Sequence, residues 1–202
     1  MDGHRVEVTA SIGIATCPDH ATSERQLMAY ADTAMYQAKD AGRNTYVEYA
    51  GWMSDSAQEQ FQLLADLRTA IDAQQMVLHY QPKLSVASQR INGAEALVRW
   101  RHPQMGMVPP DRFIRLAERS GLIIPLGRWV LDEACRQLRQ WHDAGNADWT
   151  MAVNLSPMQF SSPTLVDSVR RTLQRHAIAA HQLTLEVTES TAMKDVEATL
   201  QM

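Results

Sequence analysis

The sequence predicts an α/β protein in which a short α/β segment precedes a sheet of mostly parallel strands covered by helices. In the first segment, apolar residues alternate with polar ones over 6–14, which is typical of a strand with one buried face. Further along, near-continuous apolar strands alternate in the sequence with segments whose apolar residues have helical spacing. That order is typical of a parallel sheet with helices packed over it.

Composition narrows the class of protein. The 202 residues suffice for one large domain or two small ones. A formal net charge of −4 without any basic block argues against DNA or RNA as a partner. No stretch approaches the ~20 apolar residues that a membrane span needs. Cys17 and Cys135 stand far apart, so we expect two reduced thiols in a cytoplasmic chain.

The first segment continues with a helix and a short strand. Ser23 and Gln26 are spaced to cap the start of a helix, and Gly42 is a natural stop at its end. Helical spacing places Met28 and Met35 in the core of this helix. A short strand follows at 45–48.

A domain boundary is predicted where both periodicities fail. Residues 49–57 are small and polar, and Ser56 with Glu59 forms a capping-box pattern for the next helix. That helix is expected to turn four apolar residues inward: Phe61, Leu64, Leu67 and Ile71. The expected domains are therefore 1–48, a linker with the start of a connecting helix at 49–61, and 62–202.

The larger domain opens with a predicted hairpin. Apolar strands at 76–86 and 91–100 flank a polar turn. The remaining elements alternate, and we expect helices at 110–120, 126–141 and 163–176 and strands at 150–156 and 183–190, followed by the start of a further helix.

Three oxygen-bearing side chains interrupt these apolar strands: Glu95, Asn154 and Glu186. Each is expected late in its strand, the end that carries the active site in a barrel of parallel strands and helices. Two carboxylates and an amide oxygen meeting there suit Mg²⁺ or Mn²⁺ better than zinc. Alternatively, these residues cap strand ends or pair with arginines at 99, 101 and 115. Spacing alone leaves both interpretations open.

A family resemblance favours the metal site. Residues 95–100 read EALVRW, and around them stand YQP at 80–82, PP at 109–110, FI at 113–114, AE at 117–118, GLI at 121–123, NLS at 154–156 and EVTES at 186–190. In order and spacing, this series from about residue 62 resembles the EAL family of cyclic-di-GMP phosphodiesterases. The resemblance implies a TIM-like (β/α) barrel, of which this chain would supply a part.

The same resemblance implies roles for individual residues. Glu95, Asn154 and Glu186 match the family's Mg²⁺ or Mn²⁺ ligands. Gln81, Leu97 and Arg99 match positions that contact cyclic-di-GMP, and a planar guanidinium such as that of Arg99 suits a phosphate. Glu189 either assists the site or has a structural role at the strand end. The lysine that helps to activate water in the family is expected outside this chain, so no catalytic residue is assigned within it.

Residues 1–48 resemble the end of a GGDEF (diguanylate cyclase) domain. The matching pieces are SIGI at 11–14, ADTAMY at 31–36, AK at 38–39 and GRN at 42–44. In that family, residues matching Lys39 and Arg43 reach nucleotide phosphates. The signature loop itself does not appear, which favours the alternative that both are solvated basic residues at a helix C-terminus.

Three functions remain open at this stage. The expected one is hydrolysis of cyclic-di-GMP to the linear dinucleotide by an intact parent protein. The isolated chain is expected to be truncated and inactive, because the family's Asp-Asp pair, lysine and later Glu and Gln motifs do not appear. The alternatives are a non-catalytic cyclic-di-GMP-binding or regulatory module, and a remnant or incomplete reading frame. An open edge at the last strand also predicts poor folding or self-association.

Overall fold

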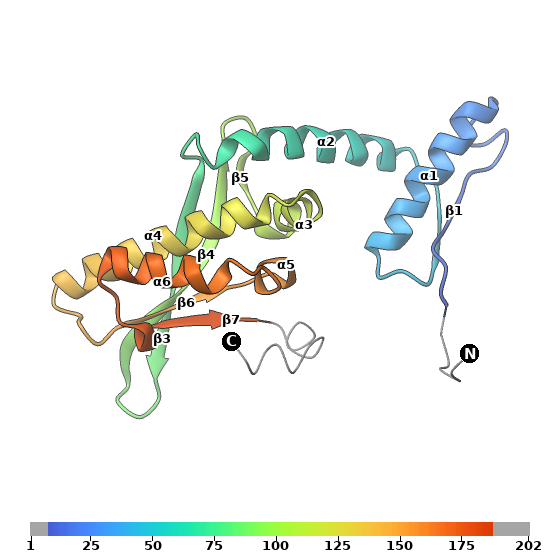
Figure 1. The fold of residues 1–202 in the computed structure, drawn as a ribbon. Helices are drawn as coiled ribbons and strands as arrows, with labels where there is room; N and C mark the ends of the chain where they lie inside the picture. Colours follow the sequence, from blue (N-terminus) through green and yellow to red (C-terminus); the bar gives the residue numbers. More distant parts are fainter. Residues whose placement is uncertain (1–7, 188–202) are drawn as a thin grey trace. The chain divides into compact units, whose positions relative to one another are not determined.

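The computed structural model describes residues 8–187, apart from the side chains of 55–57. Its contacts divide the chain into two compact units, which meet in the sequence between Leu63 and Leu64. Figure 1 shows both units and labels most of their elements. Each unit is described by itself below.

The first unit is a two-stranded parallel sheet with one helix. Strand β1 (Ile12–Ile14) pairs with β2 (Tyr46–Glu48), and helix α1 (Glu24–Asp40) packs against both. The helix begins as predicted, because the Ser23 hydroxyl accepts the backbone N–H of Gln26 at 3.3 Å. Tyr49 stacks on Tyr30 with ring centroids 4.0 Å apart, and with buried Ala34 this forms the core of the unit.

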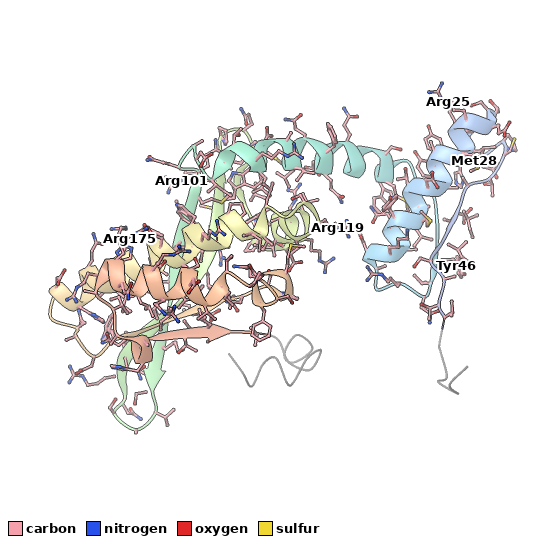
Figure 2. The ribbon with its side chains drawn as sticks, in the orientation of Figure 1. Arg25, Met28, Tyr46, Arg101, Arg119 and Arg175 are labelled. Atoms are coloured by element: carbon pink, nitrogen blue, oxygen red, sulfur yellow. The ribbon has the colours of Figure 1, made fainter. Side chains whose placement is uncertain are left out.

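The predicted buried face of the first strand is wrong. Ile12 is 54% exposed, whereas Gly13 faces α1 so closely that a Cβ there would overlap the Ala31 carbonyl oxygen. Within the described residues α1 covers only one face of this sheet, and that face needs a residue without a side chain. Met28 is likewise exposed and not in the helix core; it projects from α1 as Tyr46 does from β2 (Figure 2).

Helix α2 (Trp52–Ala70) differs from the prediction in its start and in its buried face. It begins before Ser56, so the Ser56–Glu59 capping box does not mark its N-terminus. Phe61 is 77% exposed instead of buried. The buried stripe consists of Leu63, Leu67 and Ala70 at helical spacing. Leu67 is thus buried as predicted, whereas Phe61, two residues before Leu63, lies on the opposite side of the helix.

The second unit contains a five-stranded sheet in the order β3–β4–β6–β7, with β5 (Gly106–Val108) pairing on β4. Strands β3 (Met76–Ser85) and β4 (Arg90–His102) form the predicted antiparallel hairpin, with a register shift between Lys83 and Leu84. Strands β6 (Thr150–Asn154) and β7 (Leu183–Glu186) extend the sheet in parallel, as expected. Within the described residues this sheet is open, with β3 and β7 at its edges.

Helices α3 (Pro110–Ser120) and α4 (Ile123–Asp143) of this unit pack against the sheet. The other helical elements of the unit are α5 (Pro157–Phe160), α6 (Leu165–His176) and the 3₁₀ turn η1 (Ala180–Gln182). Helix α3 has the predicted bounds, with Gly121 as a left-handed cap at φ 77°. Helix α4 packs on β3, β4 and β6, and α6 packs against α4 (Figure 1). The short elements α5, η1 and β5 were not predicted.

On the helix side of the sheet, the buried polar side chains that the structure describes are hydrogen-bonded. Trp100 is fully buried, packs edge-on against Phe113 and donates its indole N–H to Gln75 at 3.1 Å. The buried His102 ring accepts two backbone N–H groups at Nδ1, which leaves the proton on Nε2 to donate to Asp66 at 3.1 Å. This histidine is therefore structural.

Burial also raises the pKa of two side chains on this side of the sheet, Cys135 and Tyr80. Cys135 on α4 is fully buried and its pKa is raised to about 12, chiefly by loss of solvent and then by nearby Asp132. The same desolvation raises the pKa of the Tyr80 phenol above its ordinary value. Cys17 and Cys135 are both free thiols, as expected.

The open edges generate the first prediction. Strands β3 and β7 each have a described neighbour on one side only, so their outer N–H and C=O groups offer a template for another strand. We predict that the purified 202-residue chain self-associates. Size-exclusion chromatography with light scattering measures this directly; a single monomeric species with a cooperative thermal transition would contradict it.

Candidate functional site

The predicted site residues gather on one face of the second unit's sheet. In β4, Glu95, Leu97 and Arg99 alternate with residues buried toward the helices, so these three share the other face. The register places Gln81 of β3 directly opposite Glu95. It also places Asn154 directly beside Glu186, at the ends of β6 and β7.

One contact joins two of these residues, and a second joins Glu186 to Lys83. The side-chain amide of Asn154 donates to Glu95 Oε1 at 2.6 Å. Glu186 Oε1 lies 3.8 Å from the Lys83 ammonium, with both side chains 40% exposed. A pair that exposed and that long contributes little stability. The described partners of Glu95 and Glu186 are therefore Asn154 and Lys83 and not the arginines at 99, 101 and 115.

Glu95 was expected late in its strand, and this expectation is wrong. It sits in the middle of β4, which runs on to His102. The strand continues beyond Glu95 because its last residues, Trp100 to His102, pair with β5. The parallel pairing of β4 with β6 ends at Ala96, so Glu95 still lies near the end of the parallel part of the sheet.

A hollow of about 340 Å³ opens beside these residues. From the strands it is lined by Ala96, Leu97, Val98, Arg99 and Asn154, and Glu118 lines it from α3. Apolar side chains of α3 and α4 form most of the rest, so the hollow extends to the helix side of the sheet. The Arg99 guanidinium donates back to the Val98 carbonyl at 2.8 Å. The apolar walls and the Arg99 cation suit a ligand with apolar and anionic parts, whereas the Glu118 carboxylate disfavours an anion close to it.

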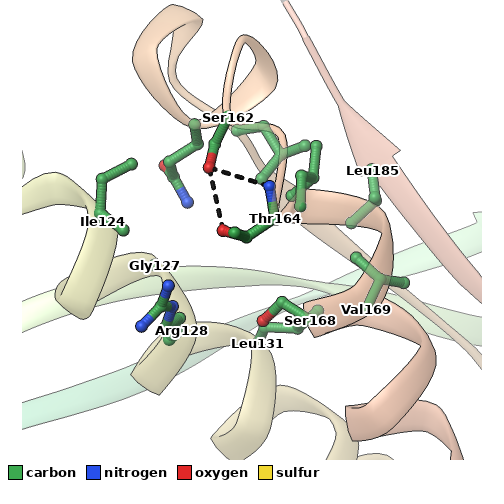
Figure 3. A pocket seen from close by; sticks show the side chains of 12 residues that line it. Ile124, Gly127, Arg128, Leu131, Ser162, Thr164, Ser168, Val169 and Leu185 are labelled. Atoms are coloured by element: carbon green, nitrogen blue, oxygen red, sulfur yellow. Dashed lines mark hydrogen bonds between the residues drawn. The ribbon is translucent and has the colours of Figure 1, made fainter.

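A second, smaller hollow of about 30 Å³ lies between α4, α5 and α6. Figure 3 shows Gly127 and Arg128 of α4 across from Ser162 and Thr164. These two hydroxyls are 3.1 Å apart, and the backbone N–H of Thr164 donates to Ser162 at 3.4 Å. Its polar groups therefore serve the local turn.

Lys39 and Arg43 lie in the first unit, away from this sheet in the sequence. Lys39 is in the last turn of α1, with its ammonium 5.0 Å from the centroid of the Tyr36 ring. Arg43 follows the helix in a left-handed conformation at φ 64° and is exposed. These positions agree with basic residues at a helix C-terminus, and a phosphate-binding role stays a prediction.

Two residues close to the site were missed from the sequence. Lys83 shares a face of β3 with Gln81, since they are two residues apart in a strand. Gln159 is buried and bonded to the turn that follows Asn154. The capping-box spacing of Ser156 and Gln159 was visible in the sequence and could have identified the second.

The donors present fit a hard divalent cation. Glu95, Asn154 and Glu186 offer only oxygen donors, which Mg²⁺ and Mn²⁺ prefer. In the part of the chain that the structure describes, no three His, Cys, Asp or Glu residues cluster as a metal site, so the set depends on the amide of Asn154. Glu189 lies outside the described residues. Among the described helices, none has both the length and the apolar character needed to cross a membrane.

Two relatives of this chain are named for the turnover of cyclic di-GMP. A bifunctional diguanylate cyclase/cyclic di-GMP phosphodiesterase of Pseudomonas aeruginosa, MucR, is 54% identical over 197 residues, which are 98% of this chain and 29% of that protein. The cyclic di-GMP phosphodiesterase NbdA of the same species is 40% identical over 200 residues, 99% of this chain and 26% of its own length. The chain thus spans less than a third of the length of these relatives.

Solved structures agree with the fold. A cyclic-di-GMP complex of the MucR phosphodiesterase is 56% identical, with a TM-score of 0.67 over 69% of this chain and 57% of that one. The EAL domain of Xanthomonas citri FimX in complex with c-diGMP is 27% identical, with a TM-score of 0.64 over 73% of this chain and 57% of that one.

The family models match both parts of the sequence in order. The diguanylate cyclase GGDEF domain matches residues 1–45, and the EAL domain matches residues 64–202. The chain therefore belongs to the EAL domain family, with the C-terminal part of a GGDEF domain ahead of it.

Proposed function

We propose that residues 64–202 contribute to an EAL-type phosphodiesterase site that hydrolyses cyclic-di-GMP to the linear dinucleotide in a longer protein. The observation that carries the proposal is the meeting of Glu95, Asn154 and Glu186 on one face of three adjacent strands. The activities named for MucR and NbdA support it.

In this proposal, Glu95, Asn154 and Glu186 hold Mg²⁺ or Mn²⁺. The bound ion would supply Lewis-acid chemistry for attack at phosphorus. Before it can be a ligand, Asn154 must turn its amide so that the oxygen replaces the nitrogen now bonded to Glu95. Glu186 is free to exchange Lys83 at small cost, because that pair is long and exposed.

Arg99, Leu97 and Gln81 are proposed to hold the dinucleotide. Arg99 is half-buried at the hollow, and its guanidinium donates to a backbone carbonyl of its own strand. A phosphate offers two oxygens to that planar fork and is the stronger partner. Leu97 lines the same hollow. Gln81 on β3 lies directly opposite Glu95 on β4.

A non-catalytic cyclic-di-GMP-binding module is the second candidate. Two observations favour it. The hollow is already lined by Leu97 and Arg99, the residues proposed to bind the dinucleotide. The set of metal donors, however, has three members among the described residues. Hydrolysis with two metal ions needs ligands for both ions and an oriented water. Binding needs only the hollow.

The first test uses the purified 202-residue chain with Mg²⁺ or Mn²⁺. We predict no hydrolysis of cyclic-di-GMP above a control containing metal alone, because three donors do not hold two ions. Product is measured by chromatography of the linear dinucleotide. Turnover that disappears in Glu95→Ala would contradict the prediction and assign a complete active site to this chain.

The second test supplies the rest of a barrel in cis. Residues 64–187 replace the corresponding segment of the P. aeruginosa MucR phosphodiesterase domain, of which the chain is a 54% identical relative. We predict that Glu95→Ala abolishes kcat by removing a metal ligand. Arg99→Ala should mainly raise KM, because a grip kept through the reaction is uniform binding.

Matched controls come from an exposed ion pair on α6. Asp167→Ala and Arg170→Ala each remove one member of a 2.8 Å surface pair and should leave kcat and KM near those of the parent graft. A loss of kcat with unchanged KM in Arg99→Ala would reject the binding role of Arg99. An active Glu95→Ala would reject the metal site.

A further inference from the structure

We propose that Gln159 is a positioning residue, which holds the turn after β6 so that Asn154 and Glu186 stay side by side. The inference rests on the metal site of the proposed function. Among the described residues, no hydrogen bond joins Gln159 to either of them, and we infer that it acts through the backbone between them. Its side chain is 9% exposed, which is unusually buried for a glutamine.

The turn is closed by two reciprocal bonds. The backbone N–H of Gln159 donates to the Ser156 hydroxyl at 3.2 Å, and the backbone N–H of Ser156 donates to Gln159 Oε1 at 3.1 Å. The cap opens α5, which has only 4 residues. A helix that short gains little from a cap, so the main effect of these bonds is to fix the path of the turn.

That path leads directly to the two proposed ligands. Asn154 is the last residue of β6, and the next N–H, that of Leu155, donates to the Glu186 carbonyl at 2.8 Å. The N–H after it belongs to Ser156 and is held by Gln159. Two successive backbone groups thus tie the end of β6 to the end of β7 and to the Gln159 amide.

Helix α4 provides the place for that amide. Gly127 packs against it so closely that a Cβ at this position would collide with Nε2 of Gln159. The glutamine is therefore wedged between α4 and the turn, and both hollows are lined by Gly127 and Gln159. An alanine at 127 would displace the amide without changing Gln159 itself.

The chain offers a matched control at the other end of β7. Gln182 in η1 makes the same kind of cap, accepting the Ala179 N–H at 3.2 Å, and donates to the Ala147 carbonyl at 2.8 Å. It precedes Leu183, where β7 begins, whereas Glu186 is where β7 ends. Its loss should cost stability without reaching the proposed ligands.

The experiment measures Mn²⁺ affinity of the 202-residue chain by electron paramagnetic resonance of free Mn²⁺, together with thermal unfolding. We expect Gln159→Leu and Gly127→Ala each to weaken Mn²⁺ binding by about tenfold, the range found when groups that orient ligands are removed. Gln182→Leu should lower Tm and leave Mn²⁺ affinity within about twofold. Alanine favours a helix more than glycine does, so Gly127→Ala separates a loss of positioning from a loss of α4.

The outcomes distinguish this inference from the proposed function. Wild-type Mn²⁺ binding that is unchanged in Gln159→Leu and in Gly127→Ala would overturn the positioning role and leave the metal site intact. An equal loss of affinity in Gln159→Leu and Gln182→Leu would reduce Gln159 to a general stabiliser and also overturn it. A wild-type chain that binds no Mn²⁺ would overturn the metal site itself, and the inference with it.

Discussion

The register of β6 between its two parallel neighbours determines the geometry of this site. Met151 and Val153 are buried toward α4, and Asn154 follows as the last residue of the strand. A slip of one residue would turn the apolar side chains away from the helices and the amide of Asn154 into them. The burial that stabilises the unit therefore also brings Asn154 beside Glu186 and within bonding distance of Glu95.

On the polar face of the sheet, the side chains of the proposed site have local partners that a bound ligand would replace. Asn154 now bonds Glu95, Lys83 lies near Glu186, and Arg99 returns to a backbone carbonyl. Each of these partners satisfies a polar group locally, yet each contact is partly exposed and leaves the side chain able to turn. By contrast, Gln159 is buried, which separates the support of the site from the groups that would meet cation and phosphate.

The sequence predicted what depends on local pattern. The hairpin, the bounds of α3 and the parallel order of β4, β6 and β7 follow from runs of apolar residues and turn signals. The alternation around Ile12 showed which residues share a face, but the choice of covered face depends on α1, which packs against Gly13. In the site, residue identity and strand ends located Asn154 and Glu186. The contacts of Lys83 and Gln159 are tertiary and carry no periodic signal.

The central claim is that three strands present oxygen donors to one divalent cation. Anomalous diffraction from Mn²⁺-soaked crystals of the protein tests it most directly. We predict one peak within about 2.5 Å of oxygens from Glu95, Asn154 and Glu186, with the Asn154–Glu95 bond broken and the amide oxygen facing the peak. No peak at these residues, or a peak that leaves the 2.6 Å Asn154–Glu95 bond in place, would contradict the account.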